Sequence, residues 1–456
     1  MTRAPIVLVS NRGPLAFDLD GDDLEARRGA GGLISGLGPI VRDTDTLWIS
    51  AAMSDADRVA AAGGVRVHEG IRSLLVDVDP ATYAASYDLI CNQILWFVHH
   101  GMFDRMRTPR FDRTTTEAWT DYQAVNAAFA SAIVEHAPAG ARVLVQDYHL
   151  ALVAPTVRAR RPDVRLAHFS HTPFATPAEF AVLPADMAAE LLTGMAAHHV
   201  CGFHSERWRN AFVENCRTVL DVAPATIVAP LASDPDDIVG AASSPACRDA
   251  LRSLNERVGD RTVLARVDRI EPSKNIVRGF EAFDLFLTEH PEWIDRVVFA
   301  ASIYPSRQNL PIYQAYRQEV ATRVALVNAR HATDTWSPID LDTQDHFPSS
   351  VALLRRADLL LVNPVRDGLN LVATEGALVN ERNVVLLLSP DAGVFDTLSD
   401  VALAVPPFDV AATADAIHTA LELDAAERAS RFDALHRVAR SRTPSDWLDD
   451  QLDALD

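Results

Sequence analysis

The stretch ADLLLVNPVRDGLNLVATE, residues 357–375, decides the fold of this chain. An apolar strand runs into a glycine turn at Gly368 that opens a helix, and the acidic residue Glu375 lies further into that helix. Backbone N–H groups at a helix start are unpaired and lie at the positive end of the helix dipole, so they suit a phosphate or a sugar hydroxyl. Because single strand–glycine–helix elements are common in α/β proteins, the rest of the chain must decide whether this one binds a ligand.

A second strand, RTVLARV (261–267), ends in DRIEPSKN and places Arg269 and Lys274 in the loop that follows it. In an open parallel sheet, ligands bind outside the carboxyl ends of the strands. We therefore expect both cations and the helix start at Gly368 to face one cleft. Two fixed cations with backbone amides fit a diphosphate, whereas the alternative is that both are solvated loop charges.

The composition is that of an ordinary globular protein. At 456 residues the chain should hold two or three domains, and strands alternating with helices indicate an α/β fold throughout. The net charge of −20 argues against a nucleic-acid partner or an anionic membrane, since both need a basic face. The positive field of a phosphate site must therefore be local.

The four cysteines are far apart and form no CxxC pair, so neither a zinc site nor a disulfide framework is indicated. They are predicted to be buried thiols in a reducing compartment. The start, MTRAPIVLVSNRG, has too few apolar residues for a signal peptide, and no run approaches membrane-spanning length. A cytoplasmic location is expected.

Two doubly wound domains facing across a cleft are predicted, with residues 1–232 as the first and 233–456 as the second. Prolines and an acidic loop interrupt the pattern near 226–237 and suggest this boundary. The last helix, about 440–456, can pack back on the N-terminal domain. Buried strands are expected at 6–10, 46–50, 94–99, 142–147, 165–170 and 198–203, and again at 261–267, 296–303, 358–364, 383–389 and 402–407. Helical spacing predicts a helix over about 116–136.

Residues that suit ligand binding also follow strands in the first half. Arg12 follows the first strand, and RRGAGGL (27–33) supplies a glycine cluster that lets the backbone approach a ligand closely. Arg12 can hold a phosphate through two parallel hydrogen bonds. An ordinary turn is the alternative, and a lone His171 would more often be structural. Asp147 and His171, each at a strand end, favour a ligand site.

The segment FDLDGDD (17–23) imitates the aspartyl nucleophile loop of haloacid-dehalogenase phosphatases. That loop needs a buried strand before it and Thr or Val after its glycine, whereas PLAF precedes here and Asp22 follows. We interpret it as a surface hairpin with an Asp20-Gly21 turn.

Together these segments resemble the trehalose-6-phosphate synthase family, the retaining GT-B glycosyltransferases of glycosyltransferase family 20. The matching blocks occur in the family's order over nearly the whole chain: SNRGP, RRGAGGL, NQILWFVHH, the W-x2-Y-x2-VN helix at Trp119, VQDYHL, HTPFATPAEFAVLP, GFHSE, VDRIEPSKN, YPSR and RDGLNLVATE. The HTPF and LVQDYHLALV forms look most like the actinobacterial branch, which includes the pseudo-glycosyltransferase of validamycin biosynthesis.

The resemblance implies a GT-B fold with an N-terminal acceptor-binding and a C-terminal nucleotide-sugar-binding domain. It implies a catalytic role for His171, Arg269, Lys274 and Asp147. The implied acceptor-binding residues are Arg12, Tyr87, Trp96 and Arg307 for the 6-phosphate and Asp147 for hydroxyls. The implied donor-binding residues are Gly32, His171, Asp367, Arg269, Lys274, the amides of Gly368, Leu369 and Asn370, and Glu375 for the ribose diol. No metal and no cofactor are expected.

Two departures from the family pattern are visible. The second tryptophan of Trp-x-Gly-Trp-Ser-Gly becomes Ala51, which reshapes the acceptor side. The usual Arg-Leu-Asp-Tyr-Ser-Lys-Gly becomes RIEPSKN, residues 269–275, which keeps both cations and is expected to be tolerated.

The implied reaction moves glucose from a nucleoside-diphosphate glucose to glucose 6-phosphate and gives α,α-trehalose 6-phosphate. GDP-glucose is favoured over UDP-glucose. A pseudo-glycosyltransferase, a glucosylglycerol-phosphate synthase and a non-catalytic sugar-phosphate sensor are the alternatives. The expected partners are small-molecule substrates, a separate downstream trehalose-6-phosphate phosphatase and a second copy of the chain in a homo-oligomer.

Overall fold

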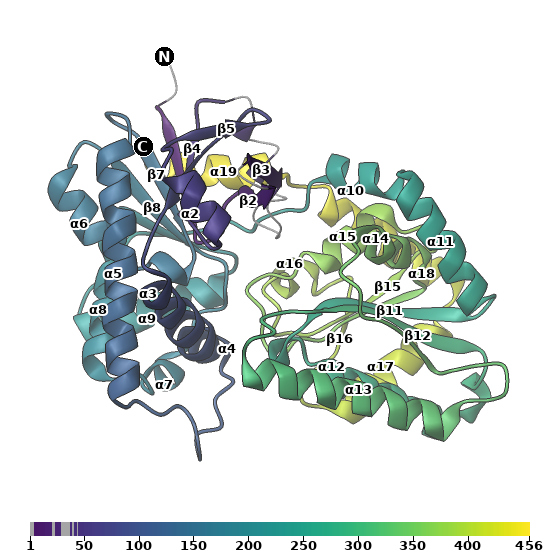
Figure 1. The fold of residues 1–456 in the computed structure, drawn as a ribbon. Coiled ribbons are helices and arrows are strands. Elements are labelled where there is room, and N and C mark those ends of the chain that lie inside the picture. Colours follow the sequence, from purple (N-terminus) through teal and green to yellow (C-terminus); the bar gives the residue numbers. More distant parts are fainter. Residues whose placement is uncertain (1–3, 21–22, 29–36, 39–40, 43) are drawn as a thin grey trace. The chain divides into compact units, whose positions relative to one another are not determined.

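The computed structural model describes residues 4–20, 23–28, 37–38, 41–42 and 44–456. They form two compact units, which Figure 1 shows as ribbons. The N-terminal unit is Met1–Leu231 with Pro444–Asp456, and the C-terminal unit is Ala232–Thr443. Each is built on a parallel sheet with connecting helices, so the predicted α/β class is confirmed.

The sheet of the N-terminal unit is parallel except at one edge, where β5 pairs antiparallel with β6. Its strand order is β10 (Thr226–Val228), β9 (Val200–Phe203), β8 (Arg165–Ser170), β7 (Arg142–Gln146), β1 (Ile6–Val9), β4 (Leu47–Ala51), β6 (Ile71–Val76) and β5 (Arg66–His68). After β1, strands β4 and β6 are added on one side of it. Strand β7 lies on the other side of β1, and β8, β9 and β10 follow in that direction. The strand order therefore reverses between β1 and β7.

Apolar side chains of helix α5 and of the strands form the core of this unit. Val125, Phe129 and Ile133 of α5 (Arg113–His136) pack on β1, β4 and β7. The other helical segments are α2 (Asp55–Ala61), α3 (Pro80–Ala84), η1 (Ala85–Leu95), α4 (Trp96–His100), η2 (Tyr148–Leu150), α6 (Val153–Arg160), α7 (Pro177–Phe180), α8 (Ala185–Ala196), α9 (Glu206–Leu220) and α19 (Pro444–Asp453).

Helix α19 completes the N-terminal unit from the far end of the sequence. Its Trp447 is fully buried, and the indole ring lies 5.0 Å from Phe169 and 5.7 Å from His171, measured between ring centroids. Phe169 belongs to β8, so the last helix packs against the strand that leads to a predicted site residue.

The strand predicted at 94–99 is wrong. These residues continue the helical segments α3, η1 and α4, which Asp79 caps at the start through its carboxylate and Gly101 ends with φ of 64°. Trp96, Phe97 and Val98 are all buried. A short apolar run that is buried on all sides does not distinguish a strand from a buried helix by periodicity.

The sheet of the C-terminal unit is parallel throughout. Its order is β13 (Ile339–Asp342), β12 (Val297–Pro305), β11 (Thr262–Ile270), β14 (Leu359–Val362), β15 (Val385–Leu388) and β16 (Leu403–Ala404). Numbered by chain position, this is the 3-2-1-4-5-6 order of dinucleotide-binding folds, and it reverses between β11 and β14.

Helices cover both faces of this sheet (Figure 1). On one face lie α12 (Ile276–Glu289), α13 (Pro311–His331) and α17 (Val410–Glu422); on the other lie α10 (Pro235–Ala242), α11 (Pro245–Val258), α14 (Phe347–Arg356), α15 (Val372–Val379) and α18 (Ala425–Ala439). The short segments are η3 (Pro272–Lys274), η4 (Pro291–Trp293) and α16 (Phe395–Leu398).

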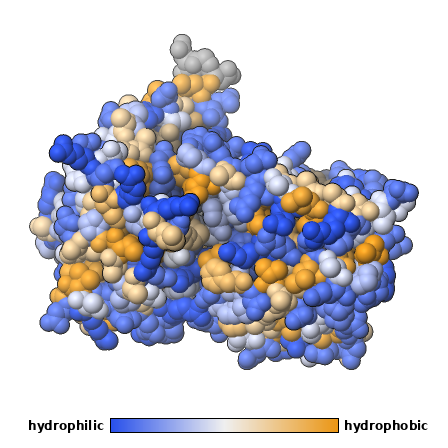
Figure 2. All heavy atoms as spheres, turned by 90° about the horizontal axis from the view of Figure 1, so that it is seen from below, coloured by the Kyte–Doolittle hydropathy of each residue, from blue (hydrophilic) through white to orange (hydrophobic). Residues whose placement is uncertain are grey.

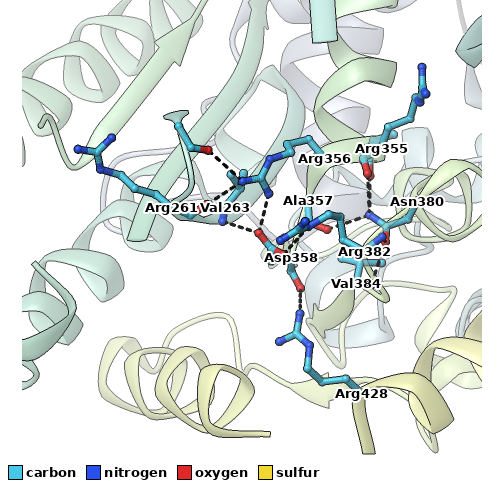
Figure 3. Close-up of polar contacts among 12 residues, drawn as sticks. Arg261, Val263, Arg355, Arg356, Ala357, Asp358, Asn380, Arg382, Val384 and Arg428 are labelled. Atoms are coloured by element: carbon cyan, nitrogen blue, oxygen red, sulfur yellow. Dashed lines mark hydrogen bonds and ion pairs between the residues drawn. The ribbon is translucent and has the colours of Figure 1, made fainter. Parts of the chain in front are cut away.

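A buried carboxylate fixes the amino end of β14 (Figure 3). Oδ2 of Asp358 accepts from the backbone N–H of Val263 at 2.9 Å and from Arg356 at 2.8 Å. Its Oδ1 accepts from Arg382 at 2.9 Å, and its backbone oxygen accepts from Arg428 at 2.8 Å. Since Val263 lies on β11, this network joins the starts of the two strands between which the order reverses.

Three smaller expectations concern the surface and the cysteines. The predicted hairpin is present as antiparallel strands β2 (Leu15–Asp20) and β3 (Asp23–Arg28), and residues 21–22 lie outside the described part. All four cysteines are buried and free, as predicted. Hydrophilic residues cover most of the face in Figure 2. None of the helices in the described ranges is long and apolar enough to span a membrane.

Candidate functional site

Arg12 and Asp147 follow the two strands between which the order of the N-terminal sheet reverses. Arg12 follows β1 and Asp147 follows β7, and the two strands are hydrogen-bonded neighbours. A reversal of strand order opens the crevice in which α/β sheets bind ligands. Gly13, next to Arg12, is required here, because a Cβ atom would lie 2.1 Å from Oγ of Ser50.

A row of stacked aromatic rings connects Arg12 with Trp96. The guanidinium of Arg12 donates to Oη of Tyr87 at 3.3 Å, and the Tyr87 ring stacks on His149 at 5.8 Å. His149 stacks on Tyr148 at 4.1 Å, and Tyr148 contacts Trp96 at 6.2 Å. Three predicted acceptor residues, Arg12, Tyr87 and Trp96, therefore lie along one row of side chains in the N-terminal unit, which runs from the exposed Arg12 to the buried Trp96.

Asp147 has an unusual backbone conformation, with φ of 71° and ψ of 166°. Such a conformation costs about 1–3 kcal/mol outside glycine and persists only where the surroundings hold it. Here the backbone oxygen of Asp147 accepts from Nε2 of His168 at 3.2 Å, and its Oδ1 accepts from the backbone N–H of His171 at 3.3 Å. Two histidines therefore hold Asp147, His168 through the backbone oxygen and His171 through the carboxylate.

His171 belongs to a chain of hydrogen bonds whose direction can be worked out. The backbone N–H of Leu231 donates to Nδ1 of His204 at 3.3 Å, so the proton of that ring is on Nε2. Nε2 of His204 then donates to Nδ1 of His171 at 3.2 Å. Nε2 of His171 carries the remaining proton and donates to Oε1 of Gln146 at 2.9 Å.

This chain of hydrogen bonds requires His171 to be neutral. If Nδ1 of His171 were protonated, two N–H donors, that of His171 and Nε2–H of His204, would face each other. Burial lowers the pKa of His171 well below its usual value, and the neighbouring His204 lowers it further. Both ring nitrogens of His171 therefore have protein partners. A sugar hydroxyl would have to replace one of them, so the predicted role of His171 toward the donor stays a prediction. Gly32 lies outside the described residues.

In the C-terminal unit, Lys274 and Asp367 meet at the switch point between β11 and β14. Nζ of Lys274 lies 2.7 Å from Oδ2 of Asp367 and 3.5 Å from Oδ1 of Asp268. The same Asp367 carboxylate accepts from the backbone N–H of Leu369 at 3.3 Å and from Nδ2 of Asn370 at 3.1 Å. Four predicted donor-binding residues are thus in direct contact.

Arg269 and Arg307 share one buried carboxylate, that of Glu271. Their guanidinium nitrogens lie 3.1 and 3.4 Å from its Oε1, which also accepts from Oγ of Ser306 at 2.9 Å. Arg307 in addition donates to Oη of Tyr313 at 2.8 Å. Glu271 is fully buried, whereas the side chain of Arg269 is 42% exposed and can reach a ligand.

The cluster carries an excess of positive charge. Its four cations are Arg266, Arg269, Lys274 and Arg307, and its three carboxylates are Asp268, Glu271 and Asp367. Burial acts to raise the pKa of Glu271, but Arg269 and Arg307 lower it to about 2. Burial also raises the pKa of Asp268, and the neighbouring Arg266 and Lys274 act against this rise.

Lys274 is held in its charged form. Burial acts to lower its pKa, but the carboxylates of Asp367 and Asp268 outweigh burial and raise it above the usual value. Lys274 therefore contributes a fixed positive charge to the cluster, in a chain whose net charge is −20.

The helix predicted to open at Gly368 begins later. Helix α15 starts at Val372, and Asn370 has φ of 81°. The glycine turn is instead held by the Asp367 carboxylate, which takes the N–H of Leu369. Gly368 to Asn370 therefore lie in a loop before the helix, and the dipole argument applies to the first residues of α15.

Glu375 lies in the first turn of α15, where its carboxyl group is close to Asp237 of the packed helix α10. Burial raises its pKa to about 7, with a smaller contribution from Asp237. Its ionisation therefore changes within the physiological pH range.

The changed loop RIEPSKN is accommodated by the fold. Asn275 takes the family's glycine position with φ of 58° and ψ of 36°, a left-handed conformation that asparagine adopts more readily than most residues. Its Nδ2 donates to the backbone oxygens of Asn363 and Pro407 at 3.0 and 2.6 Å.

Sequence reasoning missed Gln146, His204 and Glu271. Gln146 ends β7, His204 follows β9 and Glu271 follows β11, so each lies at the carboxyl end of a strand, which is the available signal. Their roles come from hydrogen bonds between distant segments, such as those of His171 with Gln146 and His204, which spacing alone does not reveal.

Replacing His204 should remove the hydrogen-bond donor to Nδ1 of His171. We expect His204→Phe to leave Nδ1 of His171 unpaired and buried, with a loss of about 1–3 kcal/mol of unfolding free energy. His204→Gln should restore most of it, because its amide can accept from Leu231 and donate to His171. Long-range ¹H–¹⁵N spectra should show the His171 proton on Nε2 in all three proteins, because the bond to Gln146 is unchanged. A wild-type His171 proton on Nδ1, or undiminished stability of His204→Phe, would contradict this chain of hydrogen bonds.

Comparison with known proteins identifies relatives over the whole length. Residues 5–456 match the model of Glycosyltransferase family 20. An alpha,alpha-trehalose-phosphate synthase [UDP-forming] of Schizosaccharomyces pombe is 28% identical over 97% of this chain and 88% of its own length. The validamine 7-phosphate valienyltransferase of Streptomyces hygroscopicus subsp. jinggangensis is 29% identical over 100% of this chain and 95% of its own.

A solved structure also matches. The crystal structure of an alpha,alpha-trehalose-phosphate synthase (UDP-forming) from Burkholderia vietnamiensis is 27% identical, with a TM-score of 0.85 over 99% of both chains. The predicted GT-B fold is thereby confirmed. The chain, with its cation cluster at one switch point and its arginine at the other, belongs to glycosyltransferase family 20.

Proposed function

We propose that this glycosyltransferase moves glucose from a nucleoside-diphosphate glucose to glucose 6-phosphate, with retention, and forms α,α-trehalose 6-phosphate. The named activities of the yeast and Burkholderia relatives support this assignment. The observation that carries it is the cluster of Arg269, Lys274 and Asp367 at the reversal of strand order. Such a position with an excess of positive charge suits a diphosphate.

Lys274 and Arg269 would act by stabilising the departing diphosphate. Negative charge grows on the leaving oxygen in the transition state, and groups already fixed in place stabilise it without reorganisation. Each cluster carboxylate is paired with a cation: Asp367 with Lys274, Glu271 with Arg269 and Asp268 with Arg266. We therefore propose front-face displacement, in which the departing phosphate accepts the proton of the acceptor hydroxyl.

Ligand binding would exchange partners within this cluster. Asp367 holds Lys274 at 2.7 Å in this structure. We propose that the diphosphate takes over Lys274 and that Asp367 then accepts hydrogen bonds from the donor sugar. Glu271 keeps Arg269 in place throughout, because it is fully buried and stays ionised.

On the acceptor side, Arg12 would bind the 6-phosphate, with Tyr87 and Trp96 beside it. Arg12 is exposed, and its contact with Tyr87 keeps the guanidinium at the end of β1. Asp147 would accept from sugar hydroxyls, since the backbone conformation held by His168 and His171 fixes its carboxylate. The assignment of Arg307 to the acceptor phosphate stays a prediction.

The second candidate is transfer of a valienyl unit by a pseudo-glycosyltransferase. The valienyltransferase relative supports it, as does Ala51 in place of the family's tryptophan. Ala51 ends β4, and its N–H donates to the backbone oxygen of Asn11 at 3.1 Å, next to Arg12. The substitution therefore falls on the proposed acceptor side.

A panel of donors and acceptors tests the function. UDP-, GDP- and ADP-glucose would each be incubated with glucose 6-phosphate, and the product identified by mass and by its 1,1-linkage. The relatives' names favour UDP-glucose, whereas the actinobacterial resemblance favours GDP-glucose. If none of the three donors gave a disaccharide phosphate, that result would contradict the proposal. A product formed only from a valienyl donor and a cyclitol phosphate would establish the second candidate.

Replacing Lys274 should reduce turnover strongly. We expect Lys274→Ala to lower kcat by about 10²–10³-fold, the loss typical of one preorganised donor at a developing charge. The matched control is Arg278→Ala, one turn into α12, whose guanidinium donates to Oδ1 of Asn275 and lies near the Phe408 ring. It should retain near-normal kcat. Undiminished turnover in a Lys274→Ala protein with normal thermal unfolding would rule out this role.

Donor binding should strengthen as the pH rises through about 7. Only the ionised form of Glu375 accepts from both ribose hydroxyls, and its pKa is about 7. Between pH 6 and 8 the carboxylate fraction rises from about 0.1 to about 0.9, so Kd should fall by up to about tenfold. Calorimetry would measure the Kd of the donor at each pH. Glu375→Gln should remove the inflection and Asp237→Asn should move it to lower pH; an unchanged inflection in Glu375→Gln would exclude Glu375 as its source.

A further inference from the structure

Three side chains that could ligate a metal ion lie close together in the C-terminal unit, near the end of α12 that is far from Lys274. His290 ends α12, Glu292 lies in η4, and His418 lies in α17. One nitrogen or oxygen of each lies within 4.8 Å of the others. Since α12 begins just after Lys274 and has 14 residues, this group lies about 21 Å along the helix axis from that end. It is therefore separate from the proposed reaction.

The imidazole rings of His290 and His418 lie against each other. Their rings are stacked at 3.7 Å with an interplanar angle of 11°, and Nδ1 of His290 lies 3.2 Å from Oε1 of Glu292. Two ligand atoms about 2.1 Å from a tetrahedral ion lie about 3.4 Å apart, so this pair already has the separation that zinc requires. Because an imidazole binds a metal ion in its own ring plane, two parallel stacked rings do not both face one ion, so the ring of His418 would have to rotate out of the stack when the ion binds.

We propose that His290, Glu292 and His418 form a binding site for a divalent transition-metal ion, with Zn²⁺ as the representative. Two neutral imidazoles and a carboxylate are the donor set that zinc, nickel and copper ions take, whereas magnesium and calcium ions prefer oxygen ligands. The ion would join the end of α12 to α17, two helices that pack together on one face of the sheet. Its role would be structural.

The surroundings leave the ligand atoms accessible. Glu292 is exposed, and both histidines are half-buried. The neighbouring cation Arg296 donates to the backbone oxygen of Glu292 at 3.4 Å and lies over the Trp293 ring at 4.6 Å. Neither contact of Arg296 involves the Glu292 carboxylate, which lies against Nδ1 of His290.

Zinc titration of the full chain tests the site. After treatment with a chelator, the wild-type protein should bind one Zn²⁺ with micromolar or tighter affinity in competition with a chromogenic chelator. Saturating Zn²⁺ should raise Tm by about 3–8 °C, because an ion that binds only the folded state stabilises it. Mg²⁺ at the same concentration should leave Tm unchanged.

Matched variants locate the ion. His418→Phe keeps an aromatic ring against His290 and Phe286 but removes the ligand, so affinity should fall at least tenfold and the Tm shift should disappear. Glu292→Gln should weaken binding to a smaller extent. His346→Phe, the same change at an exposed histidine of this unit, should behave as wild type. Undiminished zinc affinity in His418→Phe, or no zinc-dependent Tm shift in the wild type, would overturn the proposal.

Discussion

The reversal of strand order in each sheet is the constraint on which the candidate site depends. Connections leave β11 and β14 in opposite directions, so the loops at their carboxyl ends are not covered by a shared helix. Lys274 and Asp367 occupy those two loops and bond to each other. The same arrangement recurs at β1 and β7, where Arg12 and Asp147 follow the two strands. The topology thus places the predicted ligand-binding side chains, and the local sequence supplies their chemistry.

Burial of so many charges needs compensation, and the cluster provides it internally. A buried cation without a partner is costly, and an unpaired buried carboxylate is equally so. Glu271 meets this requirement for two arginines at once, and Asp367 meets it for Lys274. The site is therefore assembled before a ligand arrives. Under the proposed function, a diphosphate would exchange partners with Asp367 and would not have to order flexible side chains.

The apolar strands and the site residues at their ends could largely be predicted from the sequence. Runs such as RLAHFS and DLLLVNP are buried on both faces of a parallel sheet, so their apolar composition predicts buried strands. The run ILWFVH has the same composition but belongs to a helix, because burial on all sides removes the periodicity. The strand Ile71–Val76 was missed since Arg72 and Ser73 interrupt its apolar run. The hydrogen-bond partners of His171 were missed because they depend on segments brought together only by folding.

The return of helix α19 to the N-terminal unit makes the C-terminal unit an insertion within it. The chain passes between the units twice, once at 231–232 and once at 443–444. During synthesis, Ala232–Thr443 leaves the ribosome as a contiguous piece and can fold first. The earlier-made unit must wait for Trp447 to cover Phe169 and His171. The N-terminal unit is therefore completed only after the C-terminal unit has been made, contrary to the usual order in which the first-made domain folds first.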